Sequence, residues 1–149
     1  MGTSQHVLLE ELLDLQSEHP NAIHAATDIT GFGLLGHLSE MLLSRDLKVV
    51  LNGRAIPALA GALSLLCKGY ASSLAPANRR AWSLLDNGCV DLQLAEIDPG
   101  SEQHQALLEL LVDPQTCGPL LISVHADIAQ VLTTRLKSPW TDIGSVQAR

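Results

Sequence analysis

The chain has 149 residues and a formal net charge of −7, from 16 Asp and Glu against 9 Lys and Arg. That length suits one domain, which can bury a core without disulfides or metal ions. The acidic balance argues against a protein that binds nucleic acid or an anionic membrane, because both need a basic surface. Residues 55–67, the longest uncharged apolar stretch, are too few to span a bilayer. Three cysteines without a CxxC pair and a start without a basic segment indicate a cytoplasmic protein with no secretion signal.

Periodic leucines predict a first helix over residues 7–18. The short apolar run of residues 22–26 predicts a strand. Residues 27–33 contain two glycines and are expected to form a loop, after which a second helix covers residues 34–44. Residues 47–51 contain two valines and predict a second strand.

Pro57 and Gly69 are placed as the first residue and the stop of a third helix over residues 57–68. Small and polar residues 71–77 predict a loop. The next two elements are a short helix over residues 78–86 and a strand over residues 89–94.

Ser101 is expected to cap a helix that runs to about Leu111. After a loop, residues 119–124 predict a strand, residues 127–137 a helix and residues 141–146 a last strand. About five helices alternate with five strands, which predicts helices packed on a sheet. We therefore expect a single α+β domain over residues 1–149, a mixed β-sheet flanked by helices.

The first candidate site is the segment Thr27-Asp28-Ile29-Thr30-Gly31-Phe32-Gly33-Leu34-Leu35-Gly36-His37. Its Gly31-to-Gly36 part is formally a G-x-G-x-x-G motif, which in a dinucleotide-binding unit lets the backbone approach a pyrophosphate. Here Asp28 lies between the strand and the glycines, and Asn52 stands where a ribose-binding acid is expected. The context therefore disfavours a dinucleotide site.

Asp28, flanked by Thr27 and Thr30, has two other interpretations. Its carboxylate suits either a helix cap or turn, or a metal ion. Magnesium at a phosphate uses one or two carboxylates together with phosphate oxygens and water. If Asp28 is a ligand, its partners must lie elsewhere.

The second candidate site is the loop Asp113-Pro114-Gln115-Thr116-Cys117-Gly118-Pro119. Its polar residues suit local turn bonds as well as a functional role. Cys117 has no neighbouring cation or base in the sequence, so we expect a small buried side chain. We also expect His24 and His37 to be core or supporting groups. The pair Arg79-Arg80 is expected at a solvated helix start, with contact to an anion as the alternative.

Both segments resemble motifs of one family. Residues 27–37 resemble the TDxTGFGLLGH stretch of the selenide, water dikinase (selenophosphate synthetase) family, and residues 113–121 resemble its DPQTSGGLL stretch. Asn78 lies where that family has an asparagine between them. The order and spacing agree over nearly the whole chain.

The resemblance implies the fold of the C-terminal domain of the aminoimidazole ribonucleotide synthetase-like superfamily. The family's enzymes make selenophosphate from selenide, ATP and water, releasing AMP and phosphate, and the full-length protein is expected to be a homodimer. The N-terminal half, which supplies the catalytic Cys or selenocysteine and most ATP contacts, has no counterpart in this chain. The isolated chain is therefore expected to be inactive and to expose an apolar patch where its missing half would lie.

The resemblance also assigns residues. Asp28 is the expected Mg²⁺ ligand, lent to the phosphate cluster at the domain junction. We place ATP contacts at four further residues, Thr27, Thr30, Gly31 and Gly33, and expect no catalytic residue in this chain. Cys117 replaces a usual Ser and Pro119 a usual Gly, so any anion cradle in that loop would differ from the family's. The alternative is a stand-alone, non-catalytic regulatory or partner-binding module of the same fold.

Overall fold

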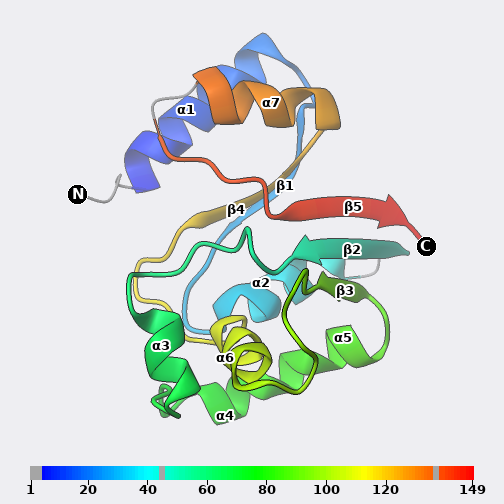
Figure 1. The fold of residues 1–149 in the computed structure, drawn as a ribbon. Helices are drawn as coiled ribbons and strands as arrows, with labels where there is room; N and C mark the ends of the chain where they lie inside the picture. Colours follow the sequence, from blue (N-terminus) through cyan, green and yellow to red (C-terminus); the bar gives the residue numbers. More distant parts are fainter. Residues whose placement is uncertain (1–4, 44–45, 136–137) are drawn as a thin grey trace.

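The computed structural model describes residues 5–43, 46–135 and 138–149. Its upper part holds two helices on a two-stranded ribbon (Figure 1). Helices α1 (Gln5–Glu18) and α7 (Ala126–Arg135) pack against strands β1 (Ile23–Asp28) and β4 (Leu120–Val124), which pair antiparallel. The buried residues of this part are Leu12, Leu15, Ala22, Ile128 and Leu132.

The lower part is built on a three-stranded sheet. Strand β2 (Leu47–Asn52) lies at its centre, parallel to β3 (Val90–Gln93) and antiparallel to β5 (Gly144–Ala148). The expected α+β class and mixed pairing are confirmed, although the described strands divide between two sheets instead of forming one. Strands β1 and β4 run from the upper helices down toward this second sheet (Figure 1).

Helix α2 (Gly33–Leu42) and the stretch before β4 complete the larger core. This core contains Leu35, Leu38, Val49, Leu51, Val90, Leu111 and Val112. The remaining helices lie below the lower sheet in the view of Figure 1: α3 (Ala62–Cys67), α4 (Ala75–Asn78), the 3₁₀ turn η1 (Arg79–Trp82), α5 (Ser83–Asp86) and α6 (Glu102–Leu110). Ser101 caps α6 as expected, because its hydroxyl accepts a hydrogen bond from the His104 amide at 3.1 Å.

Two element boundaries in the first half of the chain differ from expectation. Thr27 and Asp28 belong to β1, where they pair with Leu121 and Leu120, and do not belong to the loop. The third helix begins only at Ala62, because Gly61 has a φ of +85° that a right-handed helix cannot contain.

Two later boundaries also differ. Residues 75–77, expected as loop, belong to α4, which has a proline in its first turn. The last strand begins at Gly144, whose amide donates a hydrogen bond to the Asp142 side chain. The predicted ends of two helices, Ser44 and residues 136–137, lie outside the described residues.

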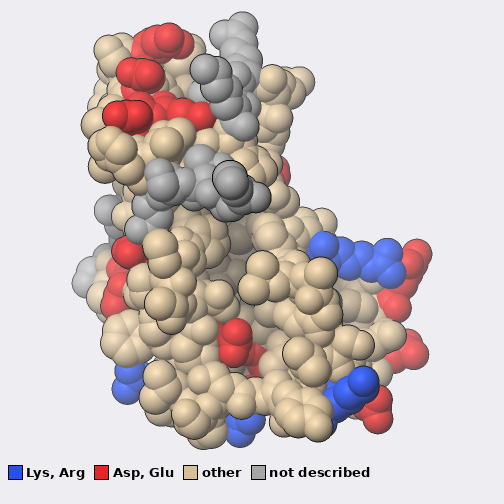
Figure 2. Space-filling view, turned by 90° about the vertical axis from the view of Figure 1, so that its left-hand side faces the viewer, with Lys and Arg blue, Asp and Glu red and all other residues tan. Residues whose placement is uncertain are grey.

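The surface carries an uneven charge distribution and exposed apolar side chains. Figure 2 shows Asp and Glu side chains on both the upper and the lower parts of one face, whereas the Lys and Arg visible there lie on the lower part only. Five large apolar side chains around α3 are exposed: Leu59, Leu63, Leu65, Tyr70 and Leu74. Among the described helices, none combines the length and apolarity needed to cross a bilayer.

Candidate functional site

The two motif segments lie side by side although they are distant in the sequence. The Ile29 amide donates to the Pro119 carbonyl at 2.9 Å, and the Gln115 amide donates to the Thr30 carbonyl at 3.0 Å. These bonds continue the β1–β4 pairing past the ends of both strands. The first segment and the second therefore form one polar edge of the molecule.

Asn78 fastens a third segment to this edge. Its side-chain amide nitrogen donates to the Gly31 carbonyl at 2.8 Å and to the Val112 carbonyl at 3.1 Å. The residue is only 6% exposed, so both carbonyls receive their bonds away from bulk solvent. Asn78 therefore joins α4 to the glycine loop and to the chain that leaves α6.

The glycine motif is a packing feature at the start of α2. Gly33 has a φ of +69°, and a Cβ on it would lie 2.7 Å from the Val112 carbonyl carbon. The Gly33 amide already donates to the Thr30 carbonyl at 3.0 Å, and the Leu35 amide donates to the Leu111 carbonyl at 2.9 Å. Amides that are bonded to protein carbonyls do not hold a pyrophosphate, which agrees with the argument against a dinucleotide site.

Asp28 lies exposed at the end of β1. Within the part of the chain that the structure describes, its carboxylate has no hydrogen bond and no ion pair. Helix α2 has Phe32 at its N-cap position and no side-chain cap, so the interpretation of Asp28 as a helix cap is wrong. A solvated carboxylate offers hard oxygen ligands of the kind Mg²⁺ takes.

Asp28 fits a magnesium ion as one ligand and not as a whole site. Over residues 5–43, 46–135 and 138–149, no cluster of three or more His, Cys, Asp or Glu side chains suits a metal ion. Magnesium needs few protein ligands when phosphate oxygens and water supply the others. The donor set therefore agrees with a shared site completed by other groups.

The two threonines beside Asp28 are differently placed. The Thr27 hydroxyl donates weakly to the Asp28 carbonyl at 3.4 Å. The Thr30 hydroxyl lies 3.0 Å from Nε2 of His37, whose side chain is 8% exposed. His37 is thus the supporting core group that was expected, whereas His24 is exposed on β1.

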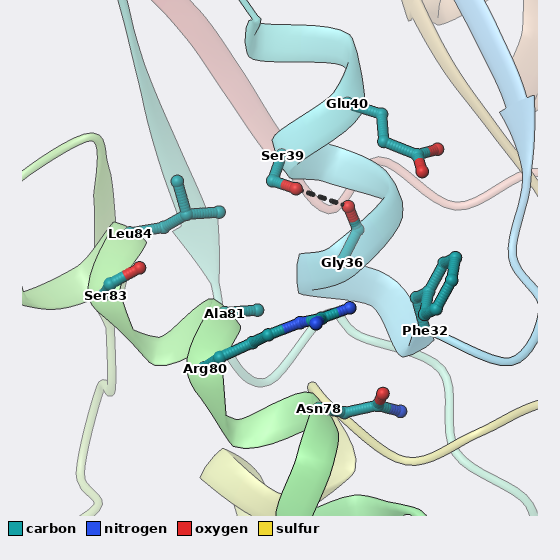
Figure 3. Close-up of a pocket in the computed structure, with 9 residues that line it drawn as sticks. All are labelled: Phe32, Gly36, Ser39, Glu40, Asn78, Arg80, Ala81, Ser83 and Leu84. Atoms are coloured by element: carbon teal, nitrogen blue, oxygen red, sulfur yellow. Dashed lines mark hydrogen bonds between the residues drawn. The ribbon is translucent and has the colours of Figure 1, made fainter.

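A cleft of about 390 Å³ opens between α2 and the α4–η1–α5 segment (Figure 3). Its lining includes Phe32, Glu40, Asn78 and Arg80. The Arg80 guanidinium lies 5.8 Å from the centre of the Phe32 ring, a cation–π contact. Arg79 instead forms a 2.8 Å ion pair with Glu109, so the two arginines are solvated but have different partners.

The second motif loop corrects one expectation. Cys117 is exposed, with a φ of +59°, and is not a buried filler. Asp113 does make the expected local bond, because Nε2 of Gln115 donates to its Oδ2 at 3.2 Å. Burial raises the pKa of the Asp113 carboxyl, the nearby Glu109 charge raises it further, and the Gln115 bond opposes both.

One group at this site was missed in the sequence. Glu40 lines the cleft and its Oε2 lies 3.3 Å from Nδ1 of His37, although the two are not aligned for a hydrogen bond. The i, i+3 spacing of His37 and Glu40 on a predicted helix was the available signal.

Comparison with known proteins supports the motif-based resemblance. Residues 4–149 match the model of the family described as AIR synthase related protein, C-terminal domain. The chain is similar to the selenide, water dikinase of Agathobacter rectalis, with 38% identity over 120 residues that cover 80% of this chain and 32% of the relative. The corresponding protein of Pelobacter propionicus is 34% identical over 124 residues, 83% of this chain and 32% of the relative.

A third relative, the selenide, water dikinase of Desulfitobacterium hafniense, is 40% identical over 108 residues, which are 72% of this chain and 28% of the relative. The chain thus spans about a third of the length of the curated relatives that it matches. The match of the family model runs over nearly all of the chain and agrees with the α+β fold. The chain belongs to the AIR synthase related protein family, as its C-terminal domain.

Proposed function

We propose that this chain is the C-terminal domain of a selenide, water dikinase, an enzyme that makes selenophosphate from selenide, ATP and water. In this proposal Asp28 supplies one ligand to Mg²⁺ at the junction with a preceding domain, and Thr27, Thr30, Gly31 and Gly33 shape the adjoining ATP site. The observation that carries it is the exposed Asp28 carboxylate, which has no partner among the described residues and caps no helix.

Bound magnesium neutralises charge on the triphosphate and positions it for attack. Asp28 contributes a fixed negative charge at the end of β1, and acts neither as a base nor as a nucleophile. Its position is held by the buried Ile29 next to it, whose amide donates to the Pro119 carbonyl. The β1–β4 pairing, in which Asp28 lies opposite Leu120, thus fixes the backbone that carries the carboxylate.

The preceding domain is the proposed partner of the apolar surface around α3. Leu59 is 83% exposed there, and Leu65, Tyr70 and Leu74 are also exposed. Covering these side chains would remove apolar surface from water. The complete enzyme is proposed to be a cytoplasmic homodimer, and the isolated chain to bind ATP and Mg²⁺ weakly without turnover.

A chimera tests this function. The matching segment of the Agathobacter rectalis enzyme is replaced by this chain, and AMP formation is measured with and without selenide. We expect AMP formation that depends on selenide, and a loss on the order of 100-fold or more in the Asp28→Asn chimera, because mutating even the groups that only support metal ligands costs about 10–100-fold.

The matched control is Asp127→Asn, since the Asp127 side chain is 88% exposed on α7 in the other part of the molecule. Its chimera should keep full activity. A folded chimera without activity would contradict the proposed function and favour the non-catalytic module. Full activity in Asp28→Asn would contradict the role of Asp28.

A further inference from the structure

The buried His37 lies between the polar edge that carries Asp28 and the cleft beside α2. Nε2 of His37 lies 3.0 Å from the Thr30 hydroxyl, and Nδ1 lies 3.3 Å from the Glu40 carboxylate. The His37 side chain is 8% exposed, whereas that of Glu40 is 51% exposed and reaches the cleft. Figure 3 shows Glu40 on the same side of α2 as Phe32, whose ring lies 5.7 Å from that of His37.

The Glu40 carboxylate favours one tautomer of His37. A neutral imidazole carries its proton on one nitrogen and accepts a hydrogen bond on the other. Nδ1 is buried and has no aligned hydrogen-bond partner, and the Glu40 carboxylate, which only accepts, lies 3.3 Å from it. A proton on Nδ1 is attracted by that carboxylate, whereas a bare Nδ1 lone pair would face it.

With the proton on Nδ1, Nε2 is an acceptor, and the Thr30 hydroxyl must donate to it. The hydroxyl has one proton, so its oxygen then has only lone pairs to offer to another group. Such an oxygen attracts a cation or water bound to one, and it repels a phosphate oxygen. The opposite tautomer would leave Thr30 free to donate to phosphate.

Thr30 lies two residues beyond Asp28, with Ile29 between them. Ile29 is 4% exposed, whereas Asp28 is exposed and Thr30 is half-buried. The Ile29 amide donates to the Pro119 carbonyl, and the Thr30 carbonyl accepts from the Gln115 amide. Thr30 is therefore held in the same short segment as the proposed cation ligand.

We propose that Glu40 and His37 are positioning residues that direct the Thr30 hydroxyl proton inward, so that the Thr30 oxygen faces the hydrated cation held by Asp28 and not the phosphates. This inference rests on the proposed function for the identity of the ligand. The tautomer itself does not, since it follows from three side chains of this chain.

The tautomer is measured on the whole ¹⁵N-labelled chain by long-range ¹⁵N–¹H correlation of the His37 ring, at a pH where imidazole is uncharged. We expect a protonated Nδ1 and an unprotonated Nε2. In Glu40→Ala the ratio of the two tautomers should shift toward Nε2–H by about tenfold, because the attraction of the carboxylate for the Nδ1 proton is lost. Glu10→Ala is the control, because Glu10 pairs with the exposed His6 on α1.

A proton on Nε2 in the unmodified chain would overturn the proposal, as would an unchanged ratio in Glu40→Ala.

In the chimera, Thr30→Val should raise the KM for Mg²⁺ about tenfold and leave the KM for selenide unchanged. Thr30→Ser should restore the KM for Mg²⁺. An equal rise in both KM values would assign Thr30 a structural role only and overturn the proposal. An inactive chimera with the expected tautomer would instead contradict the proposed function and the role at the cation, and leave the hydrogen-bond chain in place.

Discussion

The backbone of Val112 occupies the space in which a side chain on Gly33 would lie. A Cβ on Gly33 would be 2.7 Å from the Val112 carbonyl carbon, and the glycine has a φ of +69°. Gly33→Ala should therefore lower the free energy of unfolding by on the order of 2–4 kcal/mol, from left-handed strain and forced displacement of the neighbouring backbone. Urea denaturation measures the change.

Gly31→Ala is the matched control for this prediction. It lies in the same loop, but a Cβ there would meet no atom within 4 Å, and its backbone is not left-handed. Its stability should stay within about 0.5 kcal/mol of the parent. Equal losses in both variants would mean that the loop tolerates no side chain at all, contrary to the specific contact with Val112.

Local patterns predicted most helices and strands but not how the strands are shared between sheets. Helix α1 and strand β2 could be predicted because their patterns, periodic leucines and adjacent valines, lie within a few residues of each other. The end of β1 depends on Asp28 pairing with Leu120, a contact between distant segments that no local pattern contains. The start of α3 depends instead on the left-handed backbone of Gly61. The sequence shows that a glycine is present there but does not reveal its φ.

At the candidate site, the sequence identified the residues but not most of the contacts between them. Asp28 stood out as a lone carboxylate, and only the structure separates a solvated strand end from a helix cap. Asn78 was noted from a motif position, and its two bonds to Gly31 and Val112 join three segments that the sequence keeps apart. The contact between His37 and Glu40 was readable from helix spacing, but the contact between His37 and Thr30 depends on how the loop folds back.

Replacing Asn78 by aspartate should strongly destabilise the chain. The substitution keeps the shape of the side chain but replaces the nitrogen that donates to the Gly31 and Val112 carbonyls by an acceptor. A buried negative charge would then face two carbonyl oxygens, at a cost on the order of 3–5 kcal/mol. Chemical denaturation at neutral pH measures the loss.

Asn87→Asp is the control for that substitution. The Asn87 side chain is an acceptor, because its Oδ1 receives the Cys89 amide at 2.9 Å, and the residue is exposed. Aspartate keeps this role, so stability should change by less than about 0.5 kcal/mol. A mild effect at both positions would show that the Asn78 bonds contribute little to the fold.

Asp28→Asn should leave the stability of the isolated chain unchanged, within about 0.5 kcal/mol. The carboxylate is exposed and has no partner among the described residues, so no interaction of the fold is lost. Thermal melting of the parent and the variant provides the comparison. A fall of several degrees would indicate that Asp28 stabilises the fold and would weaken its assignment as a ligand.

The stability of the chain should depend on pH through Asp113. Burial and the Glu109 charge raise the pKa of this carboxyl above its ordinary value of 3.8, so the folded chain holds the proton more tightly than the unfolded chain. The free energy of unfolding should then fall as pH rises from about that value through the folded pKa, and stay level above it. Asp113→Asn stays neutral and keeps an oxygen that accepts from Gln115, so it escapes this loss. Melting curves of both proteins should coincide in strong acid and separate toward neutral pH, with the variant the more stable; a separation that is the same at every pH would contradict the raised pKa.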